Sequence, residues 1–273
     1  MWFEKTVQEQ VLQYVPLWAV TKTNPKLAAK YGVMRGLALV LAAEIGKPQL
    51  VQRGLPFNTA EKSVQWFKGL PAKLQAAADA EKKAAAQPES REAKEALADA
   101  LAATGLLDSA IATLGEVAEK LPTGSDERIG LEFKRATLAR QKFDFELAGK
   151  LYESVVPALL EKKDERAVAG VLDWSTILTS ARKADKAREL LLKAVETFPK
   201  HERKPEMRVR AATCRFSIPT PDYKDIAAEL RKIAADGPED NTWVKNALKT
   251  AEALESRAER TKPSEERKPE NSK

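Results

Sequence analysis

Residues 96–122 read ALADALAATGLLDSAIATLGEVAEKLP, and this stretch decides the fold. Its apolar residues recur at helical spacing on both sides of Gly105, which is typical of two helices joined by a tight turn. Small side chains such as Ala98 and Ala110 would let the two helices approach closely. Pro122 has no backbone N–H to continue a helix, so it marks the end of the second one. The stretch therefore predicts a helical hairpin.

The same pattern returns three more times along the chain. The landmarks of the later copies are Ala148, Tyr152 and Val155, then Ala187, Leu191, Ala194 and Pro199, and last Ile226, Leu230, Ile233 and Pro238. Counted from Ala110, the intervals are 38, 39 and 39 residues. These residues resemble tetratricopeptide repeats, whose usual period is about 34 residues, and the surplus fits longer turns between repeats. The resemblance implies a right-handed α-solenoid of helix pairs, with a closing helix over 241–260.

Two details modify this array. The second copy lacks the proline that ends the others. Pro219 and Pro221 lie where the first helix of the fourth pair should end, so we expect that helix to be short.

The first 75 residues carry a different pattern, in which short helices alternate with apolar, strand-sized segments. Asn58 or Thr59 can cap a long helix, because their side chains accept hydrogen bonds from the first free backbone N–H groups. The expected helices are 4–13, 25–31 and 59–86, and the expected strands are 15–20, 37–43 and 49–53, the last two forming a hairpin. The order predicts an α/β unit ahead of the helical array, in a protein that is mostly α.

This unit resembles the last two-thirds of a thioredoxin domain. The matching segments are NPKLAAKYGV at 24–33, LVL at 39–41, Gly46-Lys47 at the hairpin turn, and Arg53-Gly54. The family's first strands and its C-x-x-C motif are absent, and Gly36-Leu37-Ala38 stands where the family has a cis-proline. Thiol exchange needs an activated thiolate and a resolving thiol. We therefore expect a truncated thioredoxin-like unit over residues 1–75, without redox catalysis.

The central strand of that fold is missing as well, between residues 15–20 and 37–43. Its loss would expose two apolar strand edges. Three alternatives stay open: the two strands pair directly, the helical array covers the gap, or the chain is a truncated gene product. Truncation or degeneration is favoured over a newly evolved activity.

Residue composition limits the classes of function. The single cysteine, Cys214, cannot form a disulfide or a C-x-x-C pair within the chain, and we expect it to be buried. The single histidine, His201, lies in a polar turn. We expect no catalytic residue, no metal and no cofactor.

Residues 1–75 hold ten basic and four acidic side chains, a difference that equals the net charge of the whole chain, +6. That excess could attract nucleic acid, but no nucleic-acid module accompanies it, so this hypothesis ranks third.

The domain plan and location follow from the same composition. We expect a helical array over residues 76–260 and a disordered tail over 261–273, which is rich in Pro, Glu, Lys and Ser. No apolar run reaches the roughly 18 residues of a membrane span. The opening MWFEK lacks the basic and apolar regions of a signal peptide, so the expected location is cytoplasmic.

A thioredoxin-like unit followed by tetratricopeptide repeats resembles the bacterial chaperedoxins, which hold unfolding clients and can form mixed disulfides with them. The resemblance implies protein quality control or cell redox homeostasis. Our first hypothesis is a non-catalytic scaffold or chaperone-like holdase for protein or peptide clients. The alternative is a thiol-disulfide oxidoreductase whose C-x-x-C segment is missing. Binding would use inward positions on the first helices, namely Lys94, Asp99, Lys134, Asp173 and Thr176.

Overall fold

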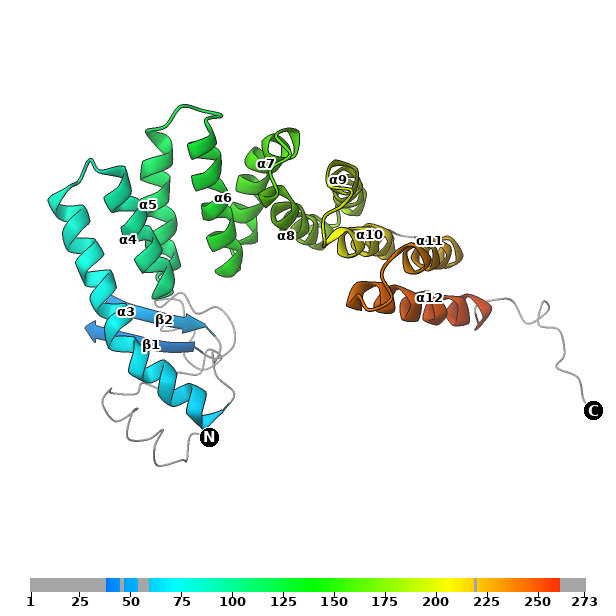
Figure 1. The fold of residues 1–273 in the computed structure, drawn as a ribbon, viewed down its shortest axis with the longest axis horizontal. Helices are drawn as coiled ribbons and strands as arrows, with labels where there is room; N and C mark the ends of the chain where they lie inside the picture. Colours follow the sequence, from blue (N-terminus) through cyan, green and yellow to red (C-terminus); the bar gives the residue numbers. More distant parts are fainter. Residues whose placement is uncertain (1–37, 45–46, 54–58, 219, 261–273) are drawn as a thin grey trace, which may run out of the picture. The chain divides into compact units, whose positions relative to one another are not determined.

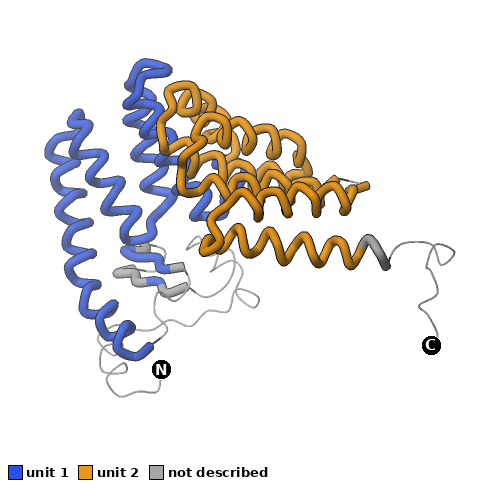
Figure 2. Tube along the Cα trace, turned by 45° about the vertical axis from the view of Figure 1, so that its right-hand side comes forward, with its two compact units in different colours: residues 1–148 blue, residues 149–273 orange. Residues whose placement is uncertain are grey.

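The computed structural model describes residues 38–44, 47–53, 59–218 and 220–260 (Figure 1). Within these ranges, two strands precede a series of helices. The elements are β1 (Ala38–Glu44), β2 (Lys47–Arg53), α3 (Ala60–Ala86), α4 (Arg91–Ala103), α5 (Leu107–Glu119), α6 (Asp126–Gln141), α7 (Phe145–Glu161), α8 (Arg166–Ser180), α9 (Ala184–Thr197), α10 (Lys204–Thr213), the short 3₁₀ helix η1 (Cys214–Ser217), α11 (Tyr223–Asp236) and α12 (Thr242–Arg260). The chain divides into two compact units, residues 1–148 and 149–273, which Figure 2 colours separately.

Each unit is built from helices that pack against the next helix in the chain. In the first unit α3 contacts α4, α4 contacts α5, and α5 contacts α6. In the second unit the same holds from α8 to α12, and α10 also contacts α12. The predicted array of helix pairs is therefore confirmed in a tetratricopeptide-like arrangement, in a chain that is mostly helical.

The repeat landmarks predicted from the sequence form the core. Ala110, Ala148, Ala187 and Ile226 occupy the same position in the four copies, and each is fully buried. Alanine at three of these positions allows close helix contact, because a larger side chain would have no space in a packed interior. Their burial confirms the repeat register.

The turns inside the first three pairs have the same backbone conformation. Gly105, Phe143 and Arg182 have φ angles of 76°, 67° and 61°, and they lie 38 and 39 residues apart. In each turn, the N–H of the next residue donates to a carbonyl five residues back at 2.9 Å, a common way to end a helix. A glycine was predicted only for the first turn. The turn geometry thus repeats with the period of the core, although the turn residue changes.

Most of the predicted helix ends are confirmed. The side chain of Thr59 accepts a hydrogen bond at the start of α3, and that of Ser90 does so at the start of α4. Asn241 accepts from the backbone N–H groups of Trp243 and Val244 at the start of α12. The first helix of the fourth pair, α10, is short, as Pro221 predicted. Between the second and third pairs, Lys163 takes up a left-handed conformation where no proline is present.

The predicted hairpin is also confirmed, since β1 and β2 pair antiparallel with Val40 opposite Val51. Leu50 and Val51 are buried. In the described residues this two-stranded sheet stands alone, so a thioredoxin-like α/β unit is not evident there. The segments expected as helices 4–13 and 25–31, strand 15–20 and tail 261–273 lie outside the described residues.

Candidate protein-binding site

The five predicted binding residues lie on first helices, and each contacts another part of its own unit. Lys94 of α4 forms an ion pair of 3.0 Å with Glu116 of α5. Asp99 of α4 pairs with Lys134 of α6, so these two first helices are neighbours. Because the charges on this face are matched locally, it does not present a strong field to a charged partner.

The two predicted residues on α8 point to different neighbours. The hydroxyl of Tyr152, which is fully buried in α7, donates to a carboxylate oxygen of Asp173 at 3.0 Å. Thr176 instead faces α10, where its hydroxyl oxygen accepts from Arg210 at 3.0 Å. Thr176 therefore lies between two first helices, whereas Asp173 helps to hold α7 against α8.

A hollow of about 250 Å³ lies next to Thr176. We call it the α8–α10 hollow; it is lined by Ser175, Thr176, Thr179, Ser180, Arg210, Thr213 and Cys214. Its hydroxyl protons are largely committed. Ser175 and Thr176 both donate to the carbonyl of Leu172, and Thr179 donates to that of Ser175, at 2.8–3.0 Å. Since each hydroxyl oxygen has two lone pairs, the hollow offers hydrogen-bond acceptors.

Arg210 joins the helices around this hollow. One guanidinium nitrogen donates to Thr176 and to the carbonyl of Leu172 on α8. Another contacts Glu206 of its own helix at 2.8 Å, and the guanidinium carbon lies 5.6 Å from the ring centre of Trp243 on α12. One side chain therefore connects α8, α10 and α12. Arg210 was not among the predicted binding residues, and its only signal in the sequence is the helical i, i+4 spacing from Glu206.

Cys214 lines the hollow but is a poor nucleophile. It is 6% exposed, and its sulfur lies 3.5 Å from the hydroxyl of Thr179. Burial raises the pKa of the thiol above its usual value. The hydrogen bond to Thr179 and the positive charges of Arg210 and Arg188 lower the pKa, but by less than burial raises it. The thiol therefore stays protonated at neutral pH, and thiolate chemistry is disfavoured. The predicted buried cysteine is confirmed.

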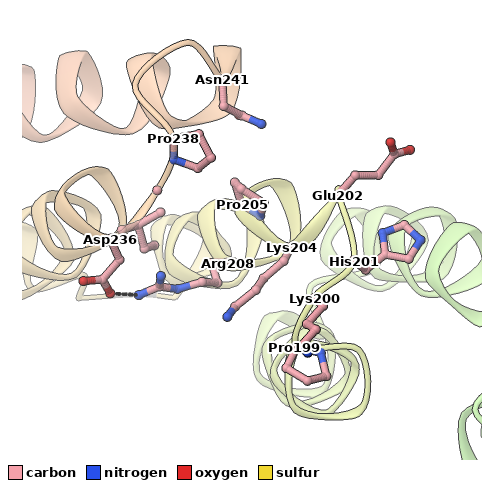
Figure 3. A pocket seen from close by; sticks show the side chains of 12 residues that line it. Pro199, Lys200, His201, Glu202, Lys204, Pro205, Arg208, Asp236, Pro238 and Asn241 are labelled. Atoms are coloured by element: carbon pink, nitrogen blue, oxygen red, sulfur yellow. Dashed lines mark hydrogen bonds and ion pairs between the residues drawn. The ribbon is translucent and has the colours of Figure 1, made fainter.

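A second hollow, of about 470 Å³, lies between the α9–α10 turn and the α11–α12 turn. Figure 3 shows Lys200, Lys204 and Arg208 on one side and Asp236 on the other, with the Arg208–Asp236 ion pair of 3.0 Å drawn as a dashed line. Its basic and acidic side chains compensate one another in part, so the hollow favours no single class of ligand. His201 belongs to its lining, and its Nδ1 accepts the backbone N–H of Arg203 at 3.0 Å.

Neither a metal centre nor a membrane-spanning helix is evident among the described residues. In that part of the chain, His, Cys, Asp and Glu side chains do not gather into a group of three that could hold a metal ion. Among the described helices, none combines the length and apolar character required to cross a membrane.

Comparisons with known proteins give limited likeness. Neither a protein-family model nor a curated protein matches the chain. One solved structure shows nearly identical TPR-like repeats that are assigned to a kinesin light chain of Podosopora anserina. The match covers 62% of this chain and 97% of that chain, at 14% identity and a TM-score of 0.45. BtubC (BKLC) from P. vanneervenii covers 78% of this chain and 98% of its own, at 16% identity and a TM-score of 0.38. The repeat assignment rests on the periodic core and turns of the chain itself.

Proposed function

We propose that this chain is a non-catalytic protein-binding scaffold, whose α8–α10 hollow receives an extended polypeptide segment. The observation that carries the proposal is the row of hydroxyl oxygens at Ser175, Thr176 and Thr179, whose protons are already donated to backbone carbonyls. An extended main chain supplies unpaired N–H donors. Donor and acceptor would then match without any charge on the ligand.

The surroundings of the hollow support this role. Arg210 fixes α8, α10 and α12 with respect to one another, so the acceptors are held in place before a ligand arrives. Such preorganisation reduces the entropy lost on binding. Affinity is expected to be modest, because a disordered client loses entropy on binding.

The same proposal has three finer parts: chaperone-like holding of unfolded segments, a cytoplasmic site of action, and a thioredoxin-like N-terminal unit. The last is supported by the β1–β2 hairpin followed by α3, the order of strand, strand and helix that the resemblance implied. A redox role gains no support from Cys214, since its thiol is buried and its pKa is raised by burial.

The test uses the full chain and a fluorescently labelled, reduced and carboxymethylated α-lactalbumin, which is an unfolded polypeptide. Binding is measured by fluorescence anisotropy. The double variant Thr176→Val, Thr179→Val keeps the shape of the side chains but removes both acceptors, including the oxygen that accepts from Arg210, and it should weaken binding by about tenfold. The matched control is Thr197→Val with Thr250→Val, whose hydroxyls lie on α9 and α12 outside the hollow.

Circular dichroism first establishes that both double variants are folded. No binding by the parent chain would remove the proposal. Equal binding by both double variants would place the polypeptide-binding surface outside the α8–α10 hollow.

A further inference from the structure

The turn between α9 and α10 contains the only histidine of the chain, and its ring holds the backbone of that turn. The Nδ1 of His201 accepts a hydrogen bond of 3.0 Å from the backbone N–H of Arg203. Arg203 precedes the first residue of α10, and its own side chain does not cap the helix. The ring also packs edge-to-face against Phe198, with the ring centres 6.3 Å apart. The neutral imidazole therefore fixes the start of α10.

A proton on His201 removes this hydrogen bond. A protonated imidazole carries an N–H at both nitrogens, so it offers no acceptor, and two donors would face each other across the turn. Its positive charge would also lie at the N-terminus of α10, where the helix dipole disfavours a cation. Histidine is the side chain whose charge ordinarily changes between about pH 5 and about pH 8. The hydrogen bond is made at the upper end of this range and is lost as the pH falls.

The charges around the ring do not select its protonated form. The charged groups that line the second hollow together with His201 are Lys200, Glu202, Lys204, Arg208 and Asp236 (Figure 3). Asp236 of α11 is paired with Arg208 of α10, and Asn241, the contribution of α12, is neutral. Two lysines and one glutamate remain, so the surroundings have no excess of negative charge that would stabilise a cation at this position.

A chain of side-chain contacts leads from the turn to the α8–α10 hollow. The Nε of Arg203 donates to one carboxylate oxygen of Glu206 at 2.8 Å, and a guanidinium nitrogen of Arg210 lies 2.8 Å from the other oxygen. Arg210 in turn donates to the hydroxyl oxygen of Thr176 in the hollow. Glu206 lies in the first turn of α10 and is 6% exposed. Because its carboxylate is shielded from water, a shift of Arg203 must change how Glu206 holds Arg210.

We infer that protonation of His201 releases the start of α10, displaces Arg210 and thereby weakens polypeptide binding in the α8–α10 hollow. A client would be held at neutral pH and released on acidification. The effect on binding rests on the proposed function, whereas the displacement of Arg210 does not. The guanidinium of Arg210 lies against the ring of Trp243, so its displacement changes the surroundings of that ring.

The experiment follows Arg210 and the client separately. The full chain is labelled with 5-fluorotryptophan, and the variant Trp243→Phe identifies the fluorine NMR signal of Trp243 among those of the five tryptophans. This signal should shift between about pH 7.5 and about pH 5.5. Over the same range, binding of the labelled α-lactalbumin, measured by fluorescence anisotropy, should weaken by about fivefold, as expected for the loss of one hydrogen bond.

Two variants separate the proton from the rest of the side chain. His201→Asn keeps an acceptor, because an asparagine oxygen readily accepts the backbone N–H two residues on, and it does not titrate. It should keep the Trp243 signal and the affinity of the parent at neutral pH over the whole range. His201→Ala has no acceptor, so it should show the acidic signal and the weaker binding at both ends of the range. Circular dichroism at each pH establishes that both variants are folded.

The outcomes distinguish this inference from the proposed function. The switch is overturned if the Trp243 signal does not move with pH, or if it moves equally in the His201→Asn variant. It is also overturned if the parent binds the client equally at both ends of the pH range. A Trp243 signal that moves in the parent alone, in a chain that binds no client at any pH, would support the displacement of Arg210 and remove the proposed function.

Discussion

The backbone N–H of Val51 in β2 donates a hydrogen bond of 2.7 Å to the carbonyl of Thr104, the residue that follows α4. Gly105 comes next in the α4–α5 turn, and the carbonyl oxygen of Val51 lies only 1.8 Å from the place where a side chain on Gly105 would begin. The hairpin can therefore dock on the first helix pair only because residue 105 has no side chain. Two segments about 50 residues apart in sequence are joined by backbone contact at this point.

Gly105→Ala should destabilise the first unit strongly. The added methyl group meets the Val51 carbonyl, and the left-handed φ of 76° adds strain, so we expect a loss of about 3 kcal/mol in the free energy of unfolding. The control is Gly69→Ala in α3, where nothing lies within 4 Å. That substitution should stabilise the helix by about 0.5–1 kcal/mol. Urea unfolding measures both, and equal effects would contradict the docking of the hairpin.

The sequence predicted the parts of this architecture that depend on periodicity and on residues with special backbone behaviour. Gly105 was identified because glycine is the usual residue at a left-handed turn. Phe143 and Arg182 adopt the same conformation without that marker, so nothing in the sequence distinguished them from helical residues. The contacts of Arg210 with α8 and α12 were also not predictable, because they depend on how helices far apart in the chain pack together. Thr176, which was named as a binding residue from its first-helix position, lines the α8–α10 hollow, and its role in binding stays a prediction.

Ala110→Leu and Ala187→Leu should each disrupt the contact between the two helices of a pair. Both alanines are fully buried, so three additional carbons have no space and the helices must separate. The expected loss is about 1–3 kcal/mol in the free energy of unfolding. Ala112→Leu, at an exposed position of α5, should change it by less than about 0.5 kcal/mol. Unchanged denaturant midpoints for both buried variants would contradict the repeat register.

Asp173 should prove more important for stability than its exposed neighbours on α8. It accepts the hydrogen bond of the fully buried Tyr152. Asp173→Ala removes that acceptor and should cost about 1–3 kcal/mol. Asp173→Asn keeps a side-chain oxygen and should cost less. If alanine and asparagine were equally tolerated in thermal unfolding, the Tyr152–Asp173 hydrogen bond would have no role in holding α7 to α8.

Cys214 should be unreactive in the folded chain. Burial raises the pKa of the thiol, so folding favours its protonated form. Stability from this source is present below the thiol pKa of the unfolded chain and is lost as the pH rises through the folded pKa. Labelling by a thiol reagent at mildly alkaline pH should be slower by on the order of 100-fold than in concentrated urea.

The same chemistry predicts no disulfide reductase activity, since residues 1–75 hold no cysteine at all. Insulin should be reduced no faster by the parent chain than by the Cys214→Ser variant. Turnover above that control would overturn the prediction and restore the oxidoreductase alternative.

Glu206 should contribute more to stability than the ion pairs on the surface. Its side chain is 6% exposed and lies 2.8 Å from both Arg203 and Arg210. Glu206→Gln removes the charge and turns an amide N–H₂ toward one of the two guanidinium groups, which leaves two donors facing each other. We expect a loss of about 2 kcal/mol in the free energy of unfolding, because a buried charge pair is broken from one side. Glu89→Gln is the matched control.

Glu89 pairs with Lys120 at 2.6 Å, but both side chains are more than half exposed. Water and salt screen such a pair, so its loss should change the free energy of unfolding very little, and the change should vanish at high salt. The effect of Glu206→Gln should persist at high salt more than that of Glu89→Gln, since the Glu206 carboxylate itself is buried. A double-mutant cycle with Arg210→Met then isolates the contact between Glu206 and Arg210. A coupling energy above about 1 kcal/mol would show that the buried carboxylate fixes the guanidinium in place. A coupling energy near zero would mean that Arg210 holds α8 and α12 without help from Glu206.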